Sequence, residues 1–165
     1  MNADGIKFQI RTIVPADNEE LAAIVRDSLE EFGAARPGTV YFDPSTDRLY
    51  ELFQTPGSRY YTAFEDGKLC GGGGIYPSRG LPAATCELVK MYLRPGSRGK
   101  GLGKSIIEKC LAFAAAAGYE KVYLETLPEL RKAMSVYERS GFRYLDAPLG
   151  DTGHFGCDIW MLKDL

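Results

Sequence analysis

A strand-like run, a glycine-rich loop and an amphipathic helix follow one another between residues 84 and 118. The run "ATCELVKMYL" is mostly apolar, as in a buried strand, and leads into "SRGKGLGKS" at residues 97–105. The apolar residues of the next segment fall at helical spacing: Ile106, Ile107, Cys110, Leu111 and Ala114. Gly118 can end this helix in the left-handed conformation. Because free N–H groups and the positive end of the dipole meet at a helix start, this order predicts an anion site in the loop.

The loop carries three cations and three glycines, yet it fits neither common nucleotide-binding motif. A P-loop ending in "GKS" would need a glycine where Arg98 stands. A dinucleotide loop could begin with Gly99 and Gly101, but its third glycine position holds Lys104. The alternative to an anion site is a glycine-rich turn with a solvated basic face. The strand–loop–helix order, with glycines that let a ligand approach the backbone, favours the anion site.

The other elements predicted along the chain give a mixed α/β domain (α+β, with one mixed sheet). Strands are expected at 7–14, in a hairpin over 59–76 that turns at Asp66-Gly67, and at 84–93, 121–126, 142–145 and 154–162. Helices are expected at 15–33, 47–54, 104–118 and 127–141, the last opened by Pro128 near its first turn. The order is β-α-α-β-β-β-α-β-α-β-β. The glycine run "CGGGG" at 70–74 predicts a bulge or a close approach between strands.

Length and charge limit the classes of partner. A chain of 165 residues predicts a single domain, 1–165. A formal net charge of −2 gives no reason to expect nucleic acid or an anionic membrane surface. No window approaches the roughly 20 apolar residues that span a bilayer, and "MNADGIKFQIRTIV" lacks the pattern of a secretory signal. We therefore expect a cytoplasmic protein.

Cysteine and histidine usage predicts neither disulfides nor a metal. Four cysteines are far apart, and buried free thiols are the expectation: Cys70, Cys86, Cys110 and Cys157. His154 is the only histidine, and its place in a turn predicts a lone surface side chain, with contact to the substrate as the alternative. No His/Cys/Asp cluster stands at ligand spacing in the sequence.

Several segments together resemble one family. "RGKGLG" at 98–103 matches [RQ]-x-x-G-x-[GA], the loop pattern of the GCN5-related N-acetyltransferases (the GNAT superfamily). "CELVKMYLRP" resembles the fourth strand that leads into that loop, and "VYERSGF" at 136–142 is similar to the family's "lYeklGF" segment. The element order is also the family's. The resemblance covers nearly the whole chain, is strongest from Glu87 to Phe142, and implies a GNAT-like fold with splayed fourth and fifth strands.

The resemblance implies a site for acetyl-CoA. In the family the loop amides hold the pyrophosphate of coenzyme A. The corresponding residues here are Arg98, Gly99, Lys100, Gly101, Leu102, Gly103, Lys104 and Ser105. The pantetheine arm would lie between the splayed strands and bond to the backbone of Met91, Tyr92 and Leu93, whose amides would also polarise the thioester carbonyl. Leu130 stands where the family often has an asparagine that contacts coenzyme A, which puts that one contact in doubt.

The resemblance also implies the acid and the base of an amine acetylation. Tyr137 matches the family's tyrosine, whose phenol keeps its proton at neutral pH and can give it to the departing thiolate. The alternative is a core tyrosine. Glu87 matches a strand glutamate that serves as general base in some members, and burial would raise its pKa toward a useful range. Glu125 and a chain of waters are the competing bases.

The predicted function is an acetyl-CoA-dependent N-acetyltransferase that acts on a primary amine of a small molecule by direct transfer in a ternary complex, without a metal. Two loops would form the acceptor walls: 33–48, which carries Tyr41, Phe42 and Asp43, and 146–155. Their aromatic and acidic residues suit an amino acid or a polyamine. A protein or peptide N-acetyltransferase and a non-catalytic acyl-CoA-binding module are the alternatives, a nucleotide hydrolase ranks last, and the family makes a homodimer an expectation by analogy.

Overall fold

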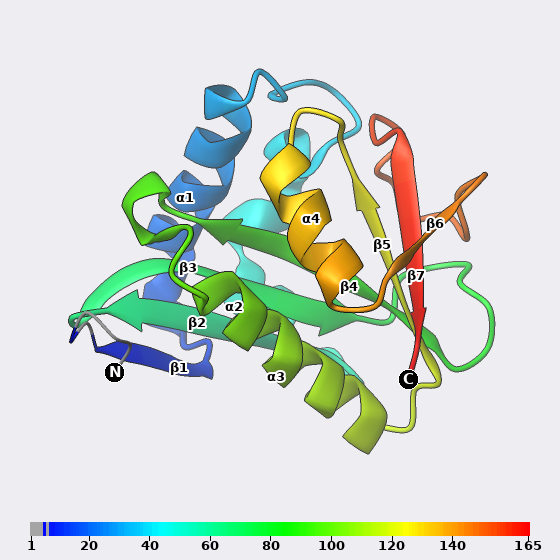
Figure 1. The fold of residues 1–165 in the computed structure, drawn as a ribbon, viewed down its shortest axis with the longest axis horizontal. Coiled ribbons are helices and arrows are strands. Elements are labelled where there is room, and N and C mark those ends of the chain that lie inside the picture. Colours follow the sequence, from blue (N-terminus) through cyan, green and yellow to red (C-terminus); the bar gives the residue numbers. More distant parts are fainter. Residues whose placement is uncertain (1–4, 6) are drawn as a thin grey trace.

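One seven-stranded sheet organises the protein in the computed structural model, which describes residue 5 and residues 7–165 (Figure 1). The strands are β1 (Phe8–Thr12), β2 (Arg59–Glu65), β3 (Lys68–Tyr76), β4 (Thr85–Leu93), β5 (Lys121–Thr126), β6 (Arg143–Leu145) and β7 (Ile159–Asp164). The helices are α1 (Asn18–Glu31), α2 (Leu49–Leu52), α3 (Leu102–Ala116) and α4 (Arg131–Arg139). The spatial order is β1-β2-β3-β4-β5-β7-β6, with β4 and β5 parallel and the other neighbours antiparallel. The predicted element order and mixed sheet are confirmed.

Helices cover both faces of this sheet, and each face has its own apolar cluster. On one face α3 and α4 pack on the strands, and the α3 residues predicted to form the stripe are buried there or partly buried. On the other face α1 and α2 pack through Leu21, Ile24 and Leu49. Each such side chain contributes roughly 1.5–3 kcal/mol when fully buried. The two clusters hold the central strands, and so the site described below, between rigid layers.

The glycine run in β3 produces the predicted bulges. The pairing of β3 shifts once against β2 and once against β4, the second time around Gly73. A Cβ on Gly72 would lie 2.4 Å from the carbonyl oxygen of Tyr61, and one on Gly73 would lie 2.7 Å from Met91 Sδ. Opposite Gly73, Lys90 has the left-handed φ of +52°. The bulge therefore depends on close strand contacts that only glycine permits.

Strands β4 and β5 separate after a short parallel contact. They pair only where Thr85–Glu87 meets Lys121–Tyr123, while both strands continue beyond this point. Residues 88–93 of β4 therefore have no strand partner on the β5 side, and Figure 1 shows the two strands diverging. The predicted splay is confirmed, and it leaves backbone groups of β4 free.

Several helix and strand boundaries differ from the predicted ones. Helix α4 begins at Arg131, so Pro128 lies in the turn before it rather than in its first turn. The last strand begins at Ile159, because residues 154–158 turn and pack Gly156 against Gly38. The second helix shrinks to α2, one turn long, after two 3-10 turns at Val40–Phe42 and Pro44–Asp47. No described helix has the length and apolar character to cross a membrane.

Candidate functional site

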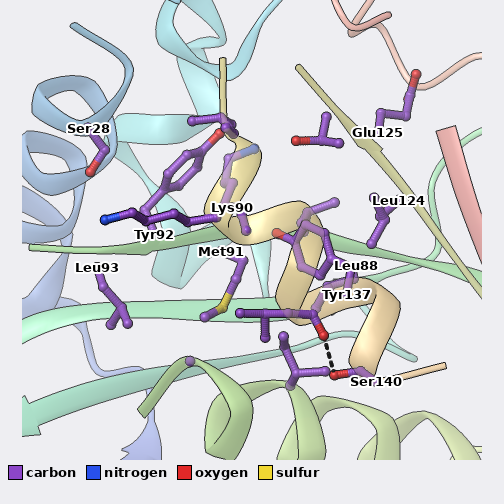
Figure 2. A pocket seen from close by; sticks show the side chains of 18 of the residues that line it. Ser28, Leu88, Lys90, Met91, Tyr92, Leu93, Leu124, Glu125, Tyr137 and Ser140 are labelled. Atoms are coloured by element: carbon purple, nitrogen blue, oxygen red, sulfur yellow. Dashed lines mark hydrogen bonds between the residues drawn. The ribbon is translucent and has the colours of Figure 1, made fainter. Parts of the chain in front are cut away.

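A cavity of about 1240 Å³ occupies the opening between β4 and β5. Its walls come from α1, β4, the glycine loop, β5, α4 and the turn that carries His154. Figure 2 shows Met91, Tyr92 and Leu93 of β4, Leu124 and Glu125 of β5, and Tyr137 of α4 around this space. One space thus joins the glycine loop to the residues predicted as acid and base, Tyr137 and Glu87.

The glycine loop presents its backbone to the cavity. Gly99 and Gly101 have φ of +74° and +84°, and a Cβ on either would meet nothing within 4 Å. Gly101 is the N-cap of α3, and the first loop-to-helix bond is donated by the Ser105 N–H to the Gly101 carbonyl. None of the N–H groups of residues 99–104 donates to another backbone group in the described chain. These free donors lie at the positive end of a helix, an arrangement that favours the binding of an anion.

The cations of the loop are paired with carboxylates rather than free. Arg98 Nη1 lies 2.8 Å from Glu31 Oε2, and its Nε donates to the Leu93 carbonyl. Lys100 Nζ lies 2.6 Å from Glu65 Oε1. Lys104 lies 3.8 Å from the Glu108 carboxylate, in an exposed pair along α3. The backbone, more than side-chain charge, is what the loop offers to an anion.

Tyr137 is buried in α4 and borders the cavity. It is 7% exposed, packs edge-on against Phe142 with ring centroids 6.0 Å apart, and its phenol makes no hydrogen bond to a described residue. Burial raises the pKa of Tyr137 above its ordinary value. The phenol is therefore protonated at neutral pH and has its donor available.

Glu87 is a buried carboxyl at the point where β4 and β5 part. It is 2% exposed and accepts a hydrogen bond from the Ser78 hydroxyl. Burial raises the pKa of Glu87 to about 7, and the nearby Glu125 carboxylate acts in the same direction. Burial also raises the pKa of Glu125, which accepts a hydrogen bond from Thr152. A group with a pKa near 7 can both take and release a proton at neutral pH.

The prediction of a surface histidine is wrong. The His154 side chain is only 11% exposed, with Nε2 3.4 Å from Asp43 Oδ2 and Nδ1 4.0 Å from Glu87 Oε2. The cause is the 146–158 segment, which folds back so that the Gly156 N–H bonds to the Gly38 carbonyl at 2.8 Å. The two loops expected as separate acceptor walls therefore meet through Asp43 and His154.

The same fold brings together three groups that sequence spacing keeps apart. One ligand atom from each of Glu87, Glu125 and His154 lies within 4.8 Å of the others. The three groups already have neighbours in the chain: Ser78, Thr152 and Asp43. Lys90, which no sequence argument singled out, completes this end of the cavity, since its Nζ lies 3.4 Å from Asp43 Oδ2.

Comparisons with known proteins agree with this geometry. Residues 21–142 match the model of the acetyltransferase (GNAT) family. The chain belongs to the GNAT acetyltransferase family. It is 38% identical over 157 residues to the uncharacterized N-acetyltransferase YjgM of Escherichia coli (strain K12), with 94% of each chain covered. The predicted family and the class of enzyme, an acyltransferase, are confirmed.

Solved GNAT structures share the fold over most of the chain. A GNAT-family acetyltransferase from Staphylococcus aureus Mu50 superposes with a TM-score of 0.85 at 19% identity, covering 96% of this chain and 99% of that one. A GNAT phosphinothricin acetyltransferase from Sinorhizobium meliloti, solved in complex with acetyl-CoA, has a TM-score of 0.75 at 21% identity and covers 96% and 88%. The GNAT-like fold predicted from the sequence is confirmed.

Proposed function

We propose that this protein transfers an acetyl group from acetyl-CoA directly to a primary amine of a small molecule. One observation carries the proposal. A single cavity joins free backbone donors at residues 99–104 to a buried carboxyl, Glu87, and a buried phenol, Tyr137. The family membership and a neighbour solved with acetyl-CoA support the choice of donor.

The residues present suit the two parts of acetyl-CoA. The N–H groups that follow Gly99 and Gly101 would hold the pyrophosphate. A Cβ on either glycine would meet nothing within 4 Å, so the ligand has room to approach the backbone there. The unpaired edge of β4 at Met91, Tyr92 and Leu93 would bond to the amides of the pantetheine arm. This arrangement uses backbone groups, so the apolar side chains there remain free to pack.

The thioester of acetyl-CoA supplies an acyl carbon that a neutral amine can attack. Glu87, directly or through water, would take the proton that the ammonium must lose. The β4 amides near Tyr92 and Leu93 would donate to the carbonyl oxygen as its negative charge grows. Tyr137 would protonate the departing sulfur. One C–N bond forms and one C–S bond breaks. The nitrogen would lose one proton to Glu87 before the attack and a second proton afterwards, and this second proton would replace the one that Tyr137 gives to sulfur. One proton is thus released overall, from Glu87 to solvent.

The closed acceptor side favours a small substrate. The contact of Gly38 with Gly156 and the contact of Asp43 with His154 join the two acceptor loops. An extended peptide needs an open groove, which this junction narrows. A peptide acceptor and a non-catalytic acyl-CoA-binding module remain the alternatives, and the cytoplasmic location and the homodimer remain predictions.

The test is release of free coenzyme A thiol from acetyl-CoA, measured across amino acids, polyamines, aminoglycosides and short peptides. Turnover of one small-amine class is expected. Turnover of peptides alone would replace the acceptor assignment. Tight acetyl-CoA binding without turnover of any amine would favour the binding module.

A further inference from the structure

Lys90 is a buried cation at the deep end of the cavity. The bulge of β4 gives it a left-handed backbone and turns its side chain toward the same side as Glu87 and Asp43. The side chain is 3% exposed and still lines the cavity (Figure 2). A lysine that is almost fully buried is rare unless it has partners.

The partners of Lys90 within the described chain do not satisfy it. An ammonium has three N–H donors, and here one carboxylate oxygen, Asp43 Oδ2, lies 3.4 Å away. That oxygen is shared with His154, and the other oxygen of Asp43 already accepts the backbone N–H and the hydroxyl of Ser45 at 2.9 and 2.7 Å. Burial accordingly lowers the pKa of Lys90, and Asp43 only partly opposes that effect.

The charged groups at this end of the cavity form two poles, an acidic one at Glu87 and Glu125 and a basic one at Lys90. Glu87 and Glu125 can accept N–H donors from a substrate ammonium, whereas Lys90 repels one. A polyamine, which is cationic along its whole length, would meet the buried lysine unfavourably. An amine that carries its own carboxylate would satisfy both poles at once. A single lysine among three carboxylates suits one negative charge better than the two of a phosphate.

We propose that Lys90 binds the carboxylate of the acceptor, so that the acceptor is a free amino acid. The inference rests on the proposed function, whose acceptor class it narrows. Lys90 is then a specificity residue: it touches the carboxylate, while Glu87 serves the amine.

The experiment compares each of the twenty standard amino acids with its carboxamide, which keeps the amine and loses the charge. We expect the wild-type protein to prefer an amino acid to its amide by about 10- to 100-fold in kcat/KM, as for one lost charge-assisted hydrogen bond. Lys90→Met should lower kcat/KM for the amino acid more than for its amide, and so bring this ratio to about threefold or less. Lys90→Arg should keep part of the preference. Lys121→Met, which removes a surface lysine paired with Asp164, should leave the ratio intact.

Equal use of acid and amide by the wild type, or equal slowing of both in Lys90→Met, would overturn the inference. If Lys90→Met does not fold, Lys90→Gln provides the same comparison with a polar side chain. Calorimetric binding of the amino acid and its amide to the coenzyme-A-bound protein separates this inference from the proposed function. Lys90-dependent binding of an amino acid without turnover would uphold the inference and reject the function. Turnover of amides or polyamines but not of amino acids would do the reverse.

Discussion

The two ends of the cavity treat charge in opposite ways. At the glycine loop Arg98 and Lys100 lie on carboxylate partners at 2.8 and 2.6 Å, and the unused donors are backbone N–H groups. At the deep end the groups that face the cavity are charged side chains, and Lys90 is held by one contact of 3.4 Å. The loop end of the cavity therefore depends on local backbone shape. The deep end depends on side chains that come from distant segments of the chain.

The largest expected effect tests whether the loop end of the cavity binds acetyl-CoA through its backbone. Gly101→Leu should weaken acetyl-CoA binding by about 100-fold or more, because it strains a φ of +84° and fills the open side of the loop. Isothermal titration calorimetry measures the change. Gly118→Leu is the matched control, since Gly118 has φ +93°, open surroundings and a place at the far end of α3. Unchanged binding by the Gly101 variant would remove the loop from the donor site.

The second-largest expected effect tests whether the Tyr137 side chain takes part in the reaction. Tyr137→Phe should lower kcat by about 100-fold, as for the loss of a general acid, with little change in the Kd of acetyl-CoA. Tyr144→Phe is the control, because Tyr144 is exposed on β6 and is absent from the residues that line the cavity. An unchanged kcat in Tyr137→Phe would return Tyr137 to a packing role.

The pH profile of kcat/KM distinguishes Glu87 from the other candidate bases, Glu125 and a chain of waters. Burial raises the pKa of Glu87 to about 7, and a base acts only when ionised, so kcat/KM should rise with pH and level off above about 7. Glu87→Gln should lower kcat/KM and remove this rise. If the rise persists in Glu87→Gln and disappears in Glu125→Gln, Glu125 is the base. If it persists in both, a water chain fits better.

The smallest effect is expected at a loop cation. Lys100→Met should change the Kd of acetyl-CoA by about threefold or less, because its charge is already matched by Glu65 and such partly exposed pairs contribute little. Repeating the titration at higher salt is the second measurement. A much larger loss would mean that Lys100 leaves Glu65 to bind the anion, and the contrast between the two ends would weaken.

Sequence reasoning succeeded where neighbours in the chain decide the outcome. The loop, the start of α3 and the glycine bulges depend on glycine conformations and helix-end donors within a few residues. The apolar stripe of α3 likewise follows from helical periodicity. Boundaries were less accurate where short segments pack on one another, as at α2 and at residues 154–158.

By itself, the sequence determined the order of elements, the family, and the position of the glycine loop at the start of a helix, because each depends on residues close together along the chain. Only the tertiary structure decided that Glu87, Lys90, Glu125 and His154 line one end of a cavity, with Asp43 in contact with Lys90 and His154. Their separations along the chain carry no spacing signal. The bulge at Lys90 and the junction of two loops bring them together, and burial then raises the pKa values of Glu87 and Glu125 and lowers the pKa of Lys90.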